Sequence, residues 1–426
     1  MIGGLMKKTS LIAIAAAAAA VFSTSASAAD LGGDCCADLE ERIAELEATT
    51  ARKGNRKVTL TVSGQVNELV YWFDDGVESN VYVGTSGFTS SRFRFKGDAK
   101  INEDWSAGYY MEIEVVSAQV SGTTAADDDA SVAVQLRQSN WYLKSKRLGT
   151  ITVGQQSHAT DDIVLYSLAG VSVSAAANLN VAPGGALTFR GSTLEVNDVF
   201  GFLDSDRANL VRYDSPAIAG FTMSASWGED DMWDVALRYA GEFNGIKVAG
   251  GIGYHVERDQ TGDAGYNLPS ELYNGGAFLT RPDFEEIRGS ISVMHVPTGL
   301  FVDFAAVHRD LDNPAFDEMF YWRLVGGIQQ KWFPIGKTSL FGEYAEVSNS
   351  ASGGFDTGLT GGFLYNNADG RSYGIGVVQT IDSAAMELYA GWRRFEADIT
   401  ESDGNVTIAV PTQDIDTLYT GARIQF

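Results

Sequence analysis

Cysteine is nearly absent from this chain, because only Cys35 and Cys36 occur and they are adjacent. Adjacent cysteines rarely bond to each other, since such a disulfide is strained. An internal disulfide is therefore not expected. Pairing of these cysteines between two chains stays open in an oxidising compartment. A lipid anchor at Cys35 is disfavoured by the charged Asp34 before it.

Long hydrophobic runs are also missing. The longest run extends from Leu11 to Phe22 and is shorter than the roughly 20 apolar residues that a membrane-spanning helix needs. Lys7 and Lys8 precede it, and an Ala-x-Ala pattern ending at Ala28 follows it. These are the parts of a secretory signal peptide. We therefore expect residues 1–28 to be a signal peptide, so that the protein is exported without a helical span.

Basic residues are in the minority, since 31 Lys and Arg stand against 55 Asp and Glu, giving a formal net charge of -24 at pH 7. A nucleic-acid partner is not expected, because binding to phosphates requires cations. Acidic outer loops could hold divalent cations beside lipid headgroups, or their charge could serve only to solvate the loops. The sequence indicates no other cofactor.

Aromatic residues and glycine are plentiful, with 22 Phe, 17 Tyr, 8 Trp and 47 Gly, yet the mean hydropathy is only -0.07. This value argues against a helical membrane protein. A β-barrel that is polar inside and apolar only in an outer band has such an average.

The closing segment Thr417–Phe426 alternates like a strand with two different faces. Apolar or small residues occupy the even positions from 418 to 424, and Arg423 lies on the other face. An arginine in mid-strand suits a wet barrel interior and would be costly against lipid. We expect this strand to pair with Val58–Tyr71 and so to remove the open edges of the sheet.

From Val58 onward, the connectors between strand-like segments are short at one end of the strands and long at the other. Short connectors are predicted near residues 102–104, 144–148, 215–219, 244–245, 297–299, 333–337 and 382–384. Long or acidic connectors are predicted near residues 74–89, 119–130, 157–206, 229–231, 257–284, 310–316, 349–370 and 398–413. Fifteen connectors join sixteen strands, and an even number with this asymmetry is typical of a bacterial barrel rather than of a secreted β-sandwich array. The predicted fold of residues 58–426 is all-β, a 16-stranded antiparallel transmembrane β-barrel.

Cations alternate with aromatic residues in one of these segments. Arg92, Arg94 and Lys96 share one face, and Phe93 and Phe95 share the other. Three cations against lipid would be severely destabilising, so their face is predicted to line the lumen. Aromatic residues near other strand ends fit the girdles that border the apolar band, namely Trp72, Trp105, Trp141, Trp227, Trp233 and Tyr254.

Residues 29–57 precede the barrel and include a helix-like stretch. Leu39, Ile43 and Leu46 are spaced like the seam of a coiled coil. This seam is too short to be stable alone. Two interpretations stay open: residues 34–53 associate between chains or contact the cell wall, or they form a frayed tether.

Several segments resemble the general porins of the outer membrane of Gram-negative bacteria. Arg207–Pro216, followed by Gly220-Phe221, resembles the family pattern R-x-N-x-V-x-Y-x-S-P…G-F. Leu148–Gln156 is similar to the strand G-x-L-x-x-G-R-Q before the family's constriction loop, and Phe426 resembles its assembly signal. Val62–Asn67 and residues 91–97 look like the opening hairpin of proteobacterial, in particular alphaproteobacterial, members. The likeness extends over residues 58–426.

The resemblance implies a homotrimer in the outer membrane, in contact with lipid and lipopolysaccharide. In each barrel the third outer loop would fold into the pore, and here that loop is residues 157–206, although a P-E-F-G-G-like motif is missing from it. The implied function is passive diffusion of ions and small hydrophilic solutes through a water-filled channel.

Charged side chains at the constriction are then expected to select solutes. The predicted wall cations are Arg92, Arg94, Lys96 and Arg137, the last with Gln135 and Ser139 on its face of the strand; the predicted loop acids are Glu195 and Asp198. Alternatively, some of these arginines only fix the loop through salt bridges. The sign of the selectivity stays open.

Catalysis is not expected from this sequence. Its four histidines, His158, His255, His295 and His308, have no recognisable spacing to a nucleophile or to other metal ligands. His158 lies near Ser157 and Asp161, which hydrogen bonding within a turn explains. A structural tether and a channel adapted to one solute stay as alternatives to a general channel.

Overall fold

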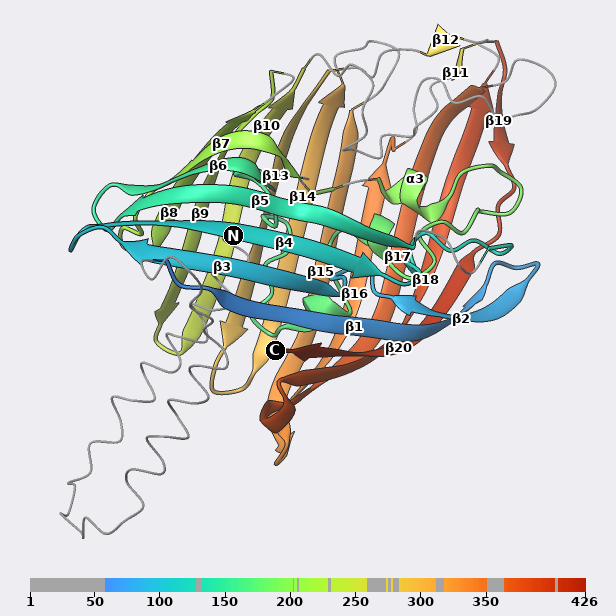
Figure 1. Ribbon diagram of the computed structural model, residues 1–426. Coiled ribbons are helices and arrows are strands. Elements are labelled where there is room, and N and C mark those ends of the chain that lie inside the picture. The colour runs from blue at the N-terminus through green and yellow to red at the C-terminus, as the bar shows by residue number, and fades with distance from the viewer. Residues whose placement is uncertain are drawn as a thin grey trace.

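The computed structural model is a closed antiparallel β-barrel (Figure 1). The structure describes residues 58–127, 132–201, 203–204, 207–228, 231–258, 273–274, 277–278, 283–311, 318–350, 364–402 and 405–426. The predicted signal peptide, the stub at 29–57 and the cysteine pair lie outside these residues. Within the described part of the chain, no helix is both long and apolar enough to cross a membrane.

Within the described residues, eighteen strand segments form the wall of the barrel. In chain order they are β1 (Thr61–Asp74), β2 (Ser79–Thr85), β3 (Arg92–Lys100), β4 (Trp105–Val116), β5 (Ala133–Ser145), β6 (Gly149–Ser157), β7 (Arg207–Asp214), β8 (Phe221–Gly228), β9 (Trp233–Phe243), β10 (Ile246–Glu257), β13 (Phe284–His295), β14 (Leu300–Leu311), β15 (Met319–Phe333), β16 (Gly336–Ser348), β17 (Leu364–Ile381), β18 (Met386–Ser402), β19 (Thr407–Val410) and β20 (Ile415–Gln425). A separate small hairpin consists of β11 (Tyr273–Asn274) and β12 (Ala277–Phe278).

These segments occupy sixteen positions in the wall, because two positions are each shared by two segments. β2 pairs with residues 68–74 of β1, and β3 pairs with residues 61–65 of the same strand. In the same way, β19 and β20 pair with different parts of β18. The prediction of a 16-stranded antiparallel barrel is therefore confirmed, and each of the seven predicted short turns joins two wall strands.

Two of the predicted long connectors are wrong in extent. The region 74–89 contains β2, in which the exposed Val81 and Val83 alternate with the buried Tyr82, so only residues 75–78 form the connection. The region 398–413 contains the end of β18 and all of β19. The glycine, serine and acidic residues that suggested loops lie within paired strands, because register with the neighbouring strand fixes them there.

The barrel closes between β1 and β20, which Figure 1 shows side by side in blue and dark red. Their register extends from Gln65 opposite Gln425 to Asp74 opposite Asp416. Tyr419 and Arg423 are buried, whereas Leu418 and Ile424 are exposed. The predicted alternation of the closing strand, with Arg423 on the inner face, is thus confirmed.

Phe426 continues the closure beyond the last residue of β20. Its N–H donates to the carbonyl of Gly64, and the Gly64 N–H donates back at 2.8 Å. The Phe426 ring lies 5.9 Å from that of Phe93. A Cβ atom on Gly64 would lie 2.5 Å from the Arg92 carbonyl oxygen and 2.6 Å from the Phe426 ring, so only glycine fits at this position.

We predict that Gly64→Ala destabilises the barrel by about 1–3 kcal/mol, because the added methyl group overpacks the closure. The measurement is the urea midpoint of the refolded protein. Gly326→Ala is the matched control, since a Cβ atom there meets nothing within 4 Å. Equal midpoints for the two variants would contradict the prediction.

Candidate functional site

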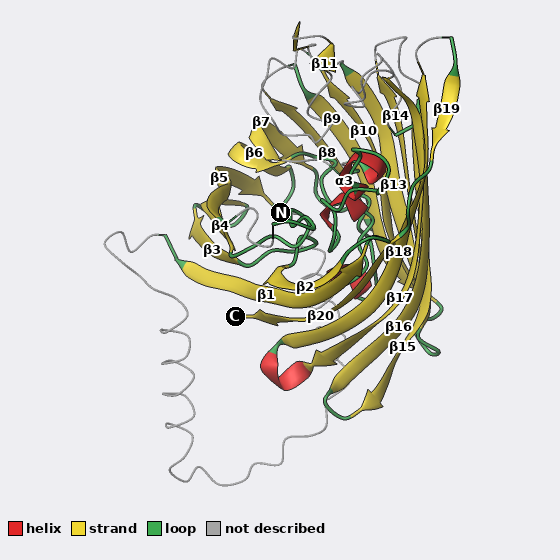
Figure 2. Ribbon diagram, turned by 90° about the vertical axis from the view of Figure 1, so that its right-hand side faces the viewer, coloured by secondary structure: helices red, strands yellow, loops and turns green. Residues whose placement is uncertain are grey.

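The long connector between β6 and β7 folds into the barrel lumen (Figure 2). It contains η1 (Val171–Val173), η2 (Leu179–Val181) and α3 (Val196–Phe200). Its small and apolar side chains belong to one buried cluster with inward side chains of the wall, such as Tyr321 and Phe395. The alanine- and valine-rich sequence of the inserted loop (residues 158–206) therefore packs closely against the wall.

Hydrogen bonds fix the path of the inserted loop around the wall. At its start, Arg212 of β7 donates to the carbonyl groups of Ser157 and His158. Further along, Ser290 and Ser292 of β13 bond to backbone groups of the loop. Other wall residues that bond to it are Gln329 of β15, Ser339 of β16, Arg393 of β18 and Tyr419 of β20. The loop thus covers the wall from β7 to β20.

A charged cluster lines the inner face of β3, β4 and β5. Glu112 accepts from Arg92 at 3.3 Å, from Arg94 at 2.7 Å and from Arg137 at 2.8 Å. Arg137 also bonds to Glu114 at 2.9 Å. Three guanidinium groups and two carboxylates leave one net positive charge in this arginine cluster.

The structure thus brings together three of the four predicted wall cations. Lys96, the fourth, is exposed on the same strand, with its Nζ atom 6.0 Å from the centre of the Tyr142 ring. Sequence reasoning missed Glu112 and Glu114. Their Glu-x-Glu spacing on one face of β4 was the available signal.

One predicted neighbour of Arg137 is wrong. The β4–β5 register shifts between Glu112 and Ile113, because β5 has a β-bulge at Arg137. The bulge reverses the alternation, so Gln138 is buried on the inner face together with Arg137, whereas Ser139 is directed outward. Gln135 does share the face of Arg137, and it bonds to Glu114 at 2.5 Å.

The predicted loop acids Glu195 and Asp198 form a capping box at the start of α3. The Glu195 N–H donates to the Asp198 carboxylate at 2.8 Å. Burial raises the pKa of both carboxyl groups, and the pKa of Glu195 is raised further by Asp198. The helix packs on the β17–β18 side, where Phe200 meets Phe395. The carboxylates that pair with the wall arginines come instead from β4.

A second segment also projects inward, between β2 and β3. Residues 86–91 (the strand excursion) leave the wall and return to it opposite β1. Asn67 of β1 holds the excursion by donating to the carbonyl of Thr89 at 2.8 Å. Phe88 lies against the buried Arg393 of β18, 5.3 Å from ring centre to guanidinium carbon. The side chain of Arg92 donates back to the Ser90 carbonyl, which joins the excursion to the arginine cluster.

The far end of the inserted loop is tied to the β1–β2 connection. Arg190 bonds to Asp75 at 2.7 Å and to Glu78 at 3.3 Å. Burial alone would raise the pKa of Asp75, but hydrogen bonds from Arg190 and from backbone N–H groups lower it overall. This contact fixes the loop across the lumen from its starting point at β6.

Comparison with known proteins gives one family. A family model described as Gram-negative porin matches residues 15–410. No curated protein matches the chain in sequence.

Solved outer-membrane barrels share the fold. An anion-selective porin from Comamonas acidovorans is 15% identical, with a TM-score of 0.56, over 87% of this chain and 100% of that one. OprB of Pseudomonas putida is 11% identical, with a TM-score of 0.57, over 91% and 97% of the two chains. OmpT of Vibrio cholerae, in a trimer form, is 14% identical, with a TM-score of 0.53, over 87% and 99%.

We predict that Arg190→Ala loosens the inserted loop. Loss of a partly exposed charged contact lowers the free energy of local opening by about 1 kcal/mol. Hydrogen exchange of residues 187–194 should therefore accelerate about five-fold. The pKa of the Asp75 carboxyl group is lowered in the folded protein, so its carboxylate stabilises the folded state above the unfolded-state pKa of about 3.9. This stabilisation is lost as the pH falls through the folded-state pKa. Protection in the native protein should therefore persist to about pH 4 and decline below it. Unchanged exchange in the variant would contradict the prediction.

Proposed function

Since the chain belongs to the Gram-negative porin family, we propose that it is an outer-membrane channel for the passive diffusion of ions and small hydrophilic solutes, with charge selection at the arginine cluster. The observation that carries this proposal is the placement of Arg92, Arg94 and Arg137 on the wall strands β3 and β5, outside the β7–β20 region that the inserted loop covers. A transported solute would pass between this charged wall and the loop.

The physical basis is charge held in place along a wet path. Fixed guanidinium and carboxylate groups favour charged and dipolar solutes, and they make the passage of apolar ones unfavourable. The net positive charge of the cluster, with Lys96 beside it, favours anions at this point. Glu195 and Asp198 are proposed to add negative potential from the loop, reduced by the burial that raises their pKa.

The remaining contacts are proposals of the same kind. Exposed apolar side chains on the outer face, such as Val134 and Ile375, support contact with lipid and lipopolysaccharide. A homotrimer is supported by the family and by the trimer form of the Vibrio cholerae protein. Divalent cations are proposed for the acidic outer loops, and Phe426 as an assembly signal. A tether role of residues 34–53 concerns a segment outside the described residues.

The first experiment is a single-channel recording of the refolded protein in a planar bilayer under a salt gradient. We expect stepwise conductance. Its complete absence from protein that has folded, as judged by its circular dichroism, would disprove the channel.

We predict that Arg92→Gln with Arg94→Gln raises the permeability of K⁺ relative to Cl⁻ by about two- to five-fold, since a charge within about 4 Å of a passing ion contributes on the order of 1 kcal/mol in water. Arg137 stays paired with Glu112 in this variant, so that the carboxylate is not left alone. The readout is the reversal potential. Arg371→Gln is the control. Arg371 is exposed, pairs with Asp398 and shares the outer face of β17 with the exposed Ile375. Equal shifts in both variants would remove the two arginines from the ion path.

A further inference from the structure

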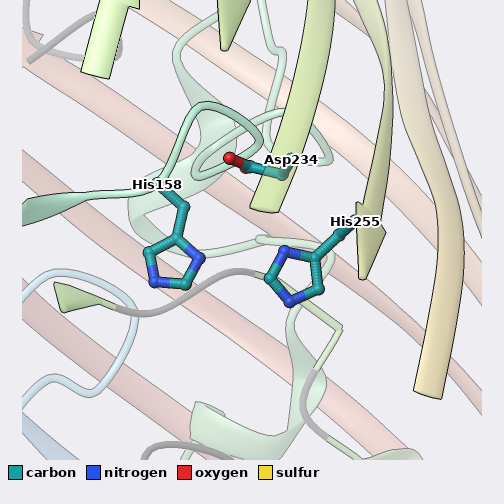
Figure 3. Close-up of side chains that lie close together, drawn as sticks. All are labelled: His158, Asp234 and His255. Atoms are coloured by element: carbon teal, nitrogen blue, oxygen red, sulfur yellow. The ribbon is translucent and has the colours of Figure 1, made fainter. Parts of the chain in front are cut away.

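We propose that His158, Asp234 and His255 form a binding site for a transition-metal ion, best suited to Zn²⁺, at the start of the inserted loop. One potential ligand atom from each of the three lies within 4.8 Å of the others. Figure 3 shows a nitrogen of each imidazole ring turned towards the other ring, with the Asp234 side chain directed above them. No metal-ligand spacing is visible in the sequence, because the three residues come from three separate segments of the chain.

The wall and the loop root hold these residues in place. Asp234 of β9 and His255 of β10 lie directly opposite each other in the strand register, and both are fully buried. His158 is the first residue after β6 and is also buried. Its ring stacks on that of His255, with the centres 5.4 Å apart and the planes 26° from parallel. Ligands on paired strands and at a fixed loop end need little ordering when an ion binds.

Neighbouring groups orient the ligands as they do in known metal sites. The Nε2 atom of His255 lies 3.3 Å from a carboxylate oxygen of Glu257. When Nε2 carries the proton and donates a hydrogen bond to Glu257, Nδ1 keeps its lone pair. A carboxylate behind a metal-bound histidine is the usual arrangement.

Asp234 is oriented by the loop itself. Its carboxylate accepts from the N–H of Ala159 at 3.2 Å and from the N–H of Thr160 at 2.6 Å. The hydroxyl groups of Thr160 and Ser226 also donate to it. An ion would replace one of these donors, and the others would hold the carboxylate in place. Metal-bound carboxylates are commonly hydrogen-bonded in this way.

The donor set indicates the kind of ion. Two imidazoles and one carboxylate suit Zn²⁺, which leaves a fourth position for water, whereas Ca²⁺ and Mg²⁺ prefer oxygen ligands alone. Ligand atoms of a tetrahedral Zn²⁺ lie about 3.3 Å apart, given bond lengths near 2.0 Å. Small side-chain rotations close the remaining gap. The bound ion would join the first loop residue to β9 and β10 and so fix the loop root.

Nearby arginines also bond to other groups. Arg288 and Arg309 pair with Glu286 of β13. Arg238 of β9 donates to the carbonyl groups of Ala159 and Asp161. Asp234 and Glu257 place two further carboxylates beside the proposed ion.

The test is Zn²⁺ titration by calorimetry of the untagged, full-length mature chain refolded in detergent, with Co²⁺ absorption as a second readout. We expect one ion for each chain, and at least a hundred-fold loss of affinity in His158→Ala and in His255→Ala. Glu257→Gln should weaken binding ten- to a hundred-fold, because it only orients His255. His295→Ala is the matched control, since His295 is exposed at the β13–β14 turn, and it should bind as the native chain does.

Folding is checked by the urea midpoint without metal, and a variant with a lowered midpoint is replaced by the corresponding Asn variant. Zn²⁺ should raise the midpoint of the native chain and of His295→Ala, but not of the two ligand variants. Absence of binding by the native chain, or an affinity in the His158 and His255 variants equal to that of the native chain, would overturn the site. Either result would show that ring stacking and hydrogen bonds alone hold the loop root. Channel conductance is measured separately, so failure of this site leaves the proposed function standing.

Discussion

Closure of the sheet is the constraint on which the rest of the structure depends. In a lipid environment each backbone N–H and C=O group needs a partner within the protein, and only a sheet without edges provides partners for all strands. The pairing of β1 with β20 supplies this condition. Once the cylinder is closed, the direction of every side chain is set by its position in the strand. One face contacts the surroundings, and the other contacts the lumen and the inserted loop.

The interior is organised by the pairing of buried charge. Glu343 of β16 bonds to Arg323 at 2.5 Å and to Arg393 at 2.6 Å, and Arg393 also donates to the inserted loop. An uncompensated charge at such a depth would cost several kcal/mol. Because Glu343 pairs with Arg323 on the adjacent β15 and with Arg393 two strands away on β18, the wall can hold cations inside the barrel and also use them to fix the loop. The arginine cluster of β3–β5 differs in lying away from these loop contacts.

Much of the fold could be predicted because alternation is local. The two faces of residues 91–97 and 417–426 are visible in the sequence itself, and the connectors give the number of strands. The inner position of Arg92 and Arg94 followed from the cost of charge against lipid. The resemblance at Arg207–Pro216 added the family, which the family model then confirmed.

The parts that could not be predicted depend on contacts between distant segments or on breaks in alternation. The bulge at Arg137 changes the face of Ser139, and no local pattern announces an extra residue in a strand. Glu195 and Asp198 were predicted from charge alone, whereas the structure uses both in a helix cap. The grouping of His158, Asp234 and His255 arises only when β9 and β10 pair and the loop returns beside them.

The strand excursion has a consequence for how such a channel can vary. Its six residues, 86–91, lie opposite only residues 66 and 67 of β1, an excess of four. Tyr82 and Arg92, on either side of the excursion, are both directed inward, because β2 and β3 each pair in register with β1. Pairing of β3 with β1 and β4 sets the direction of its arginines, so residues can be added to or removed from the excursion without turning the arginines towards lipid. The lining of the lumen can thus be lengthened or shortened while the cylinder keeps its shape.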